Sequence, residues 1–184
     1  GHALERQTAA IFDLLDELGA KATFFVLGLT AERYPDLARA ISAKGHDLAC
    51  HGYDHRRVPT QSRDEFRADV ERCAELVEQL TGKRPVGYRA PAFSITRETP
   101  WAYDVLAELG FRYDSSQYDS PRIPQRIGDV PRTPYRLELD GGREIWEYPV
   151  TVWPVRGRSV PIGGGAYWRA LPTSVLRRAL REVT

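Results

Sequence analysis

The sequence predicts an α/β protein in which parallel strands alternate with helices. Over roughly the first two thirds of the chain the same order repeats: an amphipathic helical pattern, a glycine and a short apolar run. The helical patterns follow the 3.6-residue period, and the apolar runs have the length of buried strands. Strands that alternate with helices are joined by crossovers and run parallel, which fits either a barrel or an open doubly wound sheet.

The first two repeats predict strands at residues 22–27 and 46–50. Residues 22–27 follow Gly19, which is expected to take the left-handed conformation at the end of a helix. The apolar residues of that helix have the spacing i, i+3, i+4, i+7; they are Ile11, Leu14, Leu15 and Leu18. The helix before the second strand has a similar apolar face, formed by Tyr34, Leu37, Ala38 and Ile41.

The next two repeats predict strands at residues 86–89 and 111–114. The third helix opens with Ser62 and Glu65, which have the spacing of a capping box. Its apolar face comprises Phe66, Val70, Cys73, Val77 and Leu80. The fourth helix is expected to begin at Thr99-Pro100, with threonine as the N-cap and proline at the first helical position.

The pattern changes after the fourth strand. Several prolines mark residues 115–134 as an irregular loop: Pro121, Pro124, Pro131 and Pro134. Two short runs, 137–139 and 144–150, flank an Asp-Gly-Gly sequence and predict a β-hairpin. Residues 173–183 carry a final helical pattern.

We interpret residues 1–184 as a single domain that is incomplete at both ends. The length fits one domain, but the chain begins almost inside a helix and stops without a helix cap. A repeating strand-helix protein is expected to have a strand before its first helix. The glycines at 163–165 lack the Lys-Ser/Thr pair of a phosphate loop, so they are interpreted as a turn.

Composition excludes several classes of function. The formal net charge is +1 and the charges are balanced, so neither nucleic acid nor an anionic membrane is an expected partner. No apolar run is long enough to span a bilayer, and no signal peptide is visible, so we expect a cytoplasmic protein. The two cysteines are too few for a disulfide framework and are interpreted as buried thiols. Arg177, Arg178 and Arg181 are interpreted as a solvated helix face.

Candidate functional residues follow the ends of the predicted strands. Parallel strands bring their carboxyl ends to one edge of a sheet. His51 and His55 come directly after the second strand, and histidines at i, i+4 can share one metal ion when a helical turn separates them. Two imidazoles hold a metal poorly, and Asp54 between them is expected to point elsewhere. The alternative is that both histidines are polar residues of a loop.

The third strand ends in a second group of candidates. Arg89 would keep a neighbouring carboxylate ionised and oriented, although a surface arginine is the simpler interpretation. Pro91 stiffens the following loop, so the Ala92 backbone N–H is a candidate oxyanion donor. Phe93 is either a substrate contact or a core residue.

Four motifs in this order resemble the polysaccharide deacetylase family with the NodB homology domain, carbohydrate esterase family 4. They are Lys21-Ala-Thr-Phe-Phe-Val-Leu-Gly28, His51-Gly-Tyr-Asp-His55, Arg89-Ala-Pro-Ala-Phe-Ser94 and Tyr113-Asp-Ser-Ser116. Glu147-Tyr-Pro149 and Pro161-Ile-Gly-Gly-Gly-Ala-Tyr-Trp168 resemble a subgroup associated with bacterial exopolysaccharide biosynthesis.

The resemblance implies a distorted (β/α) barrel, truncated at both ends, that removes N-acetyl groups from a polysaccharide with a divalent metal, usually zinc. His51 and His55 match its metal-binding histidines, and Arg89 matches the arginine that orients the catalytic base. The Ala92 backbone matches the oxyanion donor, and Asp114 matches a motif that walls the substrate groove. Further substrate contacts are expected from Pro91, Phe93, Tyr167 and Trp168.

The sequence departs from the family pattern in two places. The family's Asp-Asp pair, a metal ligand and a general base, is expected on a strand before Leu4 and is not seen. Its histidine acid lies late in the domain, yet no histidine follows His55. A fragment is favoured over an inactive relative. The alternatives are an allantoinase-like cyclic amide hydrolase and a non-catalytic carbohydrate-binding relative that uses aromatic residues such as Trp153.

Overall fold

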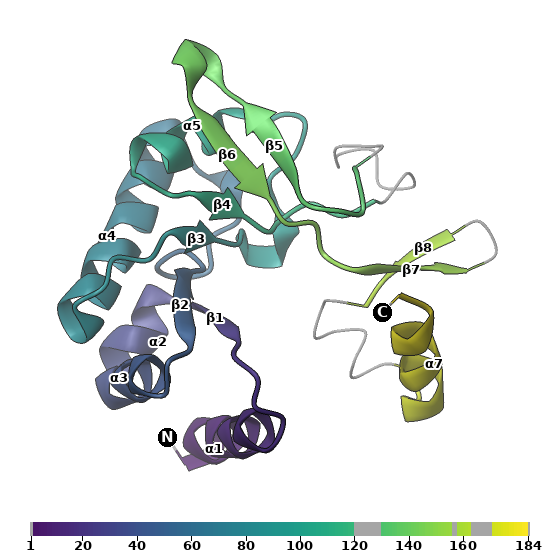
Figure 1. Cartoon of the computed structure of the whole chain (residues 1–184). Helices are drawn as coiled ribbons and strands as arrows, with labels where there is room; N and C mark the ends of the chain where they lie inside the picture. The colour runs from purple at the N-terminus through teal and green to yellow at the C-terminus, as the bar shows by residue number, and fades with distance from the viewer. Residues whose placement is uncertain (1, 120–129, 156–157, 163–170, 184) are drawn as a thin grey trace.

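The computed structural model describes residues 2–119, 130–155, 158–162 and 171–183, and it contains two β-sheets (Figure 1). Six strands pair in the order β1-β2-β3-β4-β6-β5, and β7 and β8 form a separate hairpin. The strands are β1 (Thr23–Val26), β2 (Asp47–Cys50), β3 (Gly87–Tyr88), β4 (Tyr113–Asp114), β5 (Tyr135–Glu138), β6 (Glu144–Glu147), β7 (Val152–Val155) and β8 (Arg158–Pro161).

Helices α2 to α5 lie together on one side of the six-stranded sheet (Figure 1). Helix α1 lies beside the β1 end of the sheet, and α7 packs on β7. The helices are α1 (His2–Glu17), α2 (Gly28–Arg33), α3 (Pro35–Ala43), α4 (Arg63–Thr81), α5 (Trp101–Glu108) and α7 (Thr173–Val183).

The four strands expected from the repeats are confirmed, and all of them pair in parallel. Strand β1 runs beside β2, β2 beside β3 and β3 beside β4. The register aligns Cys50 with Val26 on one side and with Tyr88 on the other, and Tyr88 with Asp114. The carboxyl ends of these strands therefore lie at one edge of the sheet, where the candidate residues were expected.

Local sequence signals define the ends of α4. The Ser62 side chain accepts the Glu65 backbone N–H at 3.2 Å, and the Glu65 carboxylate accepts the Ser62 N–H at 2.8 Å. This capping box satisfies two donors that the helix leaves unpaired, and an N-cap of this kind contributes about 1 kcal/mol. The helix ends at Gly82, whose φ of 71° is left-handed, a conformation that glycine adopts without strain.

The predicted hairpin is confirmed, but its place in the sheet was not predicted. Strands β5 and β6 pair antiparallel across Asp140–Gly142. Strand β6 also pairs in parallel with β4, which sets Asp114 opposite Glu147. The second part of the chain therefore extends the sheet built by the first part.

The largest core cluster lies between the sheet and helices α4 and α5. Its fully buried members include Phe66, Val70, Tyr88, Leu106 and Ile145. Cys50 and Cys73 are also buried in it as free thiols, as predicted. Burial is the main reason that the pKa of Cys50 is raised well above its usual value, so this thiol stays protonated and unreactive.

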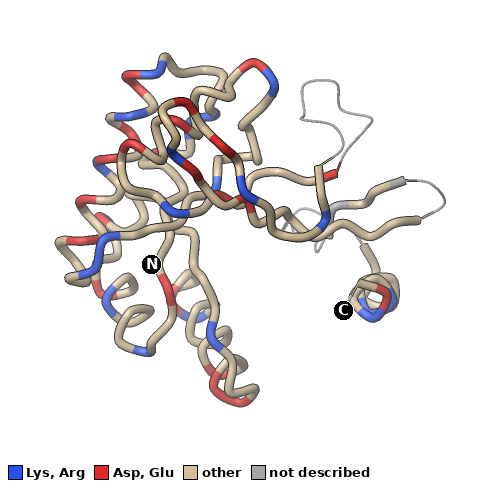
Figure 2. The backbone as a smooth tube through the Cα atoms, turned by 45° about the horizontal axis from the view of Figure 1, so that its top comes forward, with Lys and Arg blue, Asp and Glu red and all other residues tan. Residues whose placement is uncertain are grey.

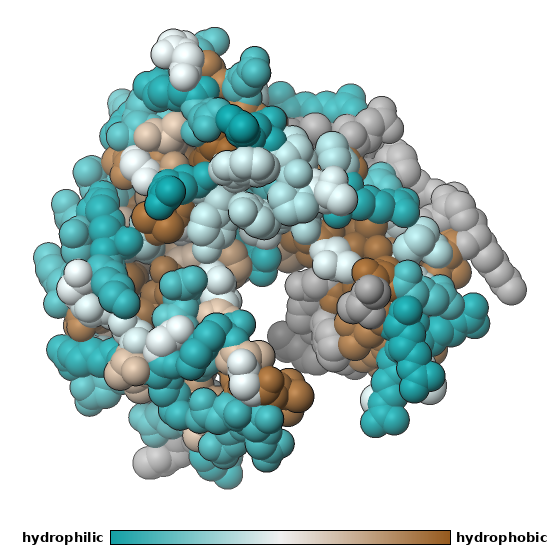
Figure 3. All heavy atoms as spheres, in the orientation of Figure 1, coloured by the Kyte–Doolittle hydropathy of each residue, from teal (hydrophilic) through white to brown (hydrophobic). Residues whose placement is uncertain are grey.

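Two predictions about helices near the amino terminus are wrong. The predicted inner face of α1 is largely exposed, with Ile11 46%, Leu14 52% and Leu18 69% exposed, and hydrophobic atoms reach the surface there (Figure 3). Phe12 faces inward instead, because its ring packs against Phe24 and His46. Helix α2 was missed because it is too short to show an apolar period.

The start of α5 also differs from the prediction. The helix begins at Trp101 and has no side-chain cap. The Thr99 hydroxyl instead accepts the Thr96 backbone N–H at 2.9 Å. Threonine therefore stabilises the turn before the helix rather than the helix end itself.

Acidic and basic residues are interspersed along the backbone (Figure 2). Many of them form exposed ion pairs, such as Lys44–Asp16 and Arg136–Glu144, and pairs of this type contribute at most about 1 kcal/mol each. Among the described residues, no helix is both long and apolar enough to cross a membrane.

Candidate active site

Three strand ends place the candidate residues side by side. The backbone N–H of His51 donates to the Val26 carbonyl at 2.9 Å, and that of Arg89 donates to the Cys50 carbonyl at 2.9 Å. The Ser115 N–H donates to the Tyr88 carbonyl at 3.0 Å. Each ladder bond continues one residue beyond its strand, so His51, Arg89 and Ser115 are held at the same edge of the sheet.

The two candidate metal ligands lie next to each other. The ring centroids of His51 and His55 are 5.2 Å apart and the rings meet edge to face at 70°. Nδ1 of His51 lies 2.7 Å from the Arg89 carbonyl oxygen. Because a carbonyl only accepts, Nδ1 carries the proton and Nε2 keeps its lone pair, which is the state a metal ligand needs. Burial lowers the pKa of His51 and so favours this neutral form.

The loop between the histidines is anchored on two helices. The Asp69 carboxylate of α4 accepts the Tyr53 backbone N–H at 2.9 Å. The Tyr53 hydroxyl donates to Glu32 of α2 at 2.6 Å and accepts from Arg72 of α4 at 2.7 Å. Gly52 has a left-handed φ of 77°. These contacts fix the backbone turn that brings the second imidazole back toward the first.

Gly52→Ala is expected to destabilise the protein more than the same change at Gly82. A Cβ at Gly52 would lie 2.8 Å from an Asp69 carboxylate oxygen, in addition to the left-handed strain. Strain of this kind costs about 1–3 kcal/mol. Gly82 is the matched control because its φ is +71° and a Cβ there meets no atom within 4 Å. Urea unfolding measures both variants, and equal destabilisation would contradict the role given to the Asp69 contact.

Arg89 is oriented rather than free at the surface. Its Nε–H donates to the Ser115 carbonyl at 2.9 Å, and Nη2 donates to the Ser115 hydroxyl at 2.6 Å. The guanidinium carbon lies 4.0 Å from the centre of the Phe25 ring. Burial lowers the pKa of Arg89, but arginine remains charged at neutral pH. Arg89 also lines a hollow of about 400 Å³, together with Thr23, Phe25, Asp47, Tyr113, Ser115 and Tyr148.

The turn after Arg89 has an unusual backbone. Ala92 and Phe93 have φ values of 54° and 53°, a conformation that non-glycine residues rarely adopt. Consecutive strained residues persist only where the surroundings hold them, and they cluster at functional sites. Ala92 is exposed, whereas Pro91 is buried, so the Pro91 ring offers no surface to a substrate. The Phe93 ring is partly buried against Tyr118.

Asp114 lies in the core instead of lining a groove. Its side chain is fully buried beside Glu147, which is also fully buried. The hairpin was predicted, but not that β6 would lie beside β4, so the sequence gave no sign of this partner. Burial, followed by the charge of Glu147, raises the pKa of Asp114 well above its usual value, and burial raises the pKa of Glu147.

Asp114→Asn is expected to weaken the pH dependence of folding stability. A carboxyl whose pKa is raised on folding holds its proton more tightly in the native state. Its contribution is therefore complete below the unfolded pKa of about 4 and is lost as pH rises toward the native value. Arg89, Tyr103 and Tyr135 also face the Asp114–Glu147 pair and remain in the variant.

Urea unfolding between pH 4 and pH 8 measures this effect. The decline in the free energy of unfolding over this range should be smaller in Asp114→Asn than in the unsubstituted protein. Glu144→Gln, a change of an exposed carboxylate on the same strand as Glu147, serves as the control. Parallel curves for all three proteins would show that the buried pair does not titrate.

The other expected residues do not join this site. Tyr167, Trp168, the glycines at 163–165 and the prolines at 121 and 124 lie outside the described residues. Trp153 packs in a small cluster with α7 and donates from Nε1 to Glu182 at 2.6 Å. Within the described ranges, no group of three or more His, Cys, Asp or Glu residues could hold a metal ion. The candidate site there contains the two histidines and Arg89.

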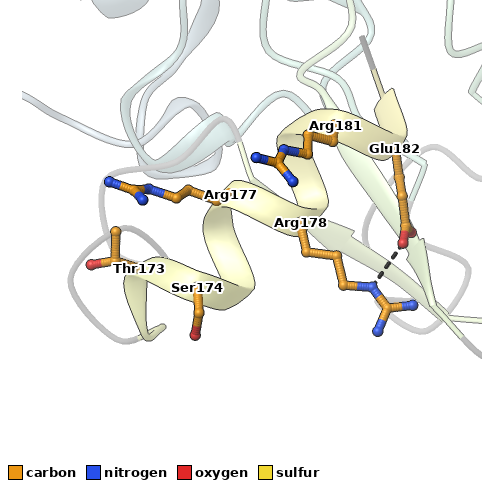
Figure 4. A pocket seen from close by; sticks show the side chains of 6 residues that line it. All are labelled: Thr173, Ser174, Arg177, Arg178, Arg181 and Glu182. Atoms are coloured by element: carbon orange, nitrogen blue, oxygen red, sulfur yellow. Dashed lines mark hydrogen bonds and ion pairs between the residues drawn. The ribbon is translucent and has the colours of Figure 1, made fainter.

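A larger hollow, of about 670 Å³, lies along α7 and away from these residues (Figure 4). Its lining comprises Thr173, Ser174, Arg177, Arg178, Arg181 and Glu182. Arg178 pairs with Glu182 at 2.8 Å on the exposed face of the helix. None of the candidate catalytic or metal-binding residues contributes to this surface.

Comparison with known proteins divides the chain at the end of β4. Residues 2–113 match the family model described as polysaccharide deacetylase. Residues 115–184 match a second family model, described as a domain of unknown function (DUF3473).

Curated relatives include a peptidoglycan deacetylase-like protein of Gibberella zeae, 36% identical over 58% of this chain and 31% of that protein. A peptidoglycan-N-acetylglucosamine deacetylase of Bacillus cereus is 33% identical over 52% of this chain and 35% of the relative. A chitooligosaccharide deacetylase of Azorhizobium caulinodans is 26% identical over 67% of this chain and 60% of its own length. The chain spans only about a third of the length of the first two.

Solved structures show the same fold. A protein of Mycobacterium smegmatis, assigned as a polysaccharide deacetylase, superimposes with a TM-score of 0.63 at 36% identity, covering 76% of this chain and 44% of that one. Puue allantoinase superimposes with a TM-score of 0.67 at 23% identity, covering 94% of this chain and 51% of its own. At that identity the second likeness concerns the fold alone.

Proposed function

Because the chain belongs to the polysaccharide deacetylase family, we propose that the protein is a metal-dependent hydrolase that removes N-acetyl groups from a polysaccharide. One observation carries the proposal: His51 and His55 lie with ring centroids 5.2 Å apart at the strand edge that also holds Arg89. The names of the relatives, peptidoglycan and chitooligosaccharide deacetylases, support N-acetylglucosamine polymers as the substrate class.

The two histidines fit a divalent metal such as zinc. The hydrogen bond of His51 Nδ1 to the Arg89 carbonyl leaves Nε2 unprotonated, and His55 is exposed at the end of the same loop. Zinc prefers imidazole nitrogen, and catalytic zinc sites commonly use three protein ligands. The described residues supply two of these. When bound, the metal would polarise the acetyl carbonyl and lower the pKa of a bound water.

Arg89 and Ala92 have separate roles in the proposed reaction. The guanidinium, held by Ser115, presents a fixed cation that would orient a carboxylate base beside the hollow it lines. The left-handed turn exposes Ala92, and its backbone N–H would donate to the oxygen that becomes negative as water attacks the acetyl group. Both roles depend on geometry that the sheet edge provides.

Residues 1–184 are proposed to act as one structural unit. The pairing of β6 with β4 supports this, because it places a strand from the segment of unknown function inside the sheet of the deacetylase segment. An antiparallel partner, β5, then covers the outer edge of β6.

The direct test is acetate release from N-acetylglucosamine oligomers by the full-length protein. After treatment with a chelator, activity should disappear, and stoichiometric zinc should restore it. A protein that releases acetate equally well after complete metal removal would refute metal dependence. A metal-loaded protein that binds the oligomers without releasing acetate would refute the hydrolase and favour a carbohydrate-binding function.

A further inference from the structure

The segment of unknown function contributes one fully buried carboxylate to the core beneath the candidate site. Glu147 is the last residue of β6 and is 0% exposed. It lies opposite Asp114, the last residue of β4, which is also 0% exposed. Acidic side chains are almost never fully buried unless they have partners, so the contacts of Glu147 indicate what it does.

Glu147 accepts hydrogen bonds from the chain that continues past β4. One carboxylate oxygen accepts the backbone N–H of Ser116 at 3.1 Å and that of Gln117 at 3.0 Å. The other accepts the Tyr103 hydroxyl at 3.3 Å. Three donors from two elements thus meet on one side chain, and the backbone at residues 116 and 117 is fixed to β6.

The residues fixed by Glu147 are those that hold the Arg89 loop. Ser115 binds the Arg89 guanidinium through its carbonyl and its hydroxyl. The Ser116 hydroxyl accepts the Ala90 backbone N–H at 2.8 Å and donates to Asp114 at 2.7 Å. A continuous set of hydrogen bonds therefore runs from Glu147 through residues 115–117 to Arg89 and to the start of the left-handed turn.

We propose that Glu147 is a positioning residue for Arg89, supplied by the segment of unknown function. Its carboxylate holds the backbone of residues 115–117 in the one arrangement that orients the Arg89 guanidinium and fixes Ala90. The proposal rests on the proposed function for its catalytic consequence, but its structural part stands on the hydrogen bonds alone. The segment 115–184 thereby completes the deacetylase site instead of forming an independent module.

Three variants separate positioning from general destabilisation. Glu147→Leu removes the acceptor but keeps an apolar side chain of similar size. Glu147→Gln keeps a carbonyl that can accept both backbone N–H groups, so it is the conservative rescue. Ile145→Val changes another fully buried residue of β6 that makes none of these hydrogen bonds, and it is the matched control.

The first measurement is hydrogen exchange of the Arg89 Nε–H in the full chain, followed by NMR and assigned with Arg89→Lys. Exchange should accelerate about tenfold in Glu147→Leu, because local opening governs it, and should stay within about twofold in Glu147→Gln and Ile145→Val. Equal exchange in Glu147→Leu and Ile145→Val overturns the proposal. So does a Gln variant that exchanges as fast as the Leu variant.

The second measurement is the kinetics of acetate release by the metal-loaded full-length protein. In Glu147→Leu, kcat should fall about tenfold or more with KM nearly unchanged, since small displacements of an aligned group cost this much. An unchanged kcat overturns the catalytic consequence. If no protein, including the unsubstituted one, releases acetate, the proposed function fails while the exchange measurement still decides the positioning role.

Tyr103→Phe keeps the test decisive if Glu147→Leu does not fold. This change removes only the hydroxyl that donates to the second oxygen of Glu147. Exchange of the Arg89 Nε–H should accelerate by about threefold, less than for loss of the whole acceptor. Exchange identical to that of Ile145→Val overturns the proposal.

Discussion

Arg89→Ala is expected to lower kcat for acetate release by about a hundredfold or more, which corresponds to about 2.7 kcal/mol of transition-state stabilisation. The guanidinium is held by two hydrogen bonds from Ser115 and lies 4.0 Å from the Phe25 ring. A fixed planar cation can both keep a carboxylate base ionised and aim it. Because a bound metal also favours ionisation, lost orientation should dominate the effect.

Two further substitutions test this explanation. Arg89→Lys should restore little activity, because an ammonium group cannot reproduce the forked hydrogen bonds to Ser115. Arg84→Ala, at a partly exposed arginine paired with Glu78, should leave kcat unchanged. Zinc affinity, measured by calorimetry, should stay within about threefold in all three variants, since Arg89 contributes only its carbonyl to His51. Near-normal acetate release from Arg89→Ala would refute the assigned role.

Replacement of either histidine by alanine is expected to weaken zinc binding by more than about a hundredfold. Changes to residues that only orient a ligand already cost 10- to 100-fold in affinity, and here a ligand itself is lost. Titration of the apo protein with Zn²⁺ against a chromophoric chelator measures the affinity. Acetate release should fall in parallel, because the metal would activate the water.

His46→Leu provides the matched control for the histidine variants. His46 lies just before the start of β2, at the opposite end of that strand from His51, where its ring stacks against Phe12 and Phe24. The change should leave zinc affinity unaltered. Equal zinc affinity in His51→Ala, His55→Ala and the unsubstituted protein would exclude these histidines as ligands.

Much of the deacetylase segment could be predicted because its signals are local. A helix period, a capping box at Ser62 and Glu65, and glycines after helices are each legible within a few residues. They correctly located the four parallel strands and therefore the edge at which His51 and Arg89 meet. The i, i+4 spacing of the histidines was likewise sufficient to expect adjacent rings.

Predictions from periodicity failed where the neighbours of an element decide its orientation. Ile11, Leu14 and Leu18 form the more regular apolar stripe of α1, yet Phe12 is the residue that packs inward on Phe24 and His46. The period shows that a helix has an apolar face but not which other surface covers it.

The sequence by itself determined the order of strands β1 to β4, their parallel direction and the loop that carries the two histidines. Only the tertiary structure decided that β6 adds to β4, and with it the burial of Asp114 beside Glu147. The physical reason is sequence separation: helices, caps and turns depend on residues a few positions apart, whereas this pairing closes a loop of about thirty residues whose cost and reward no local pattern records. The contact that holds Arg89 in place belongs to that second class.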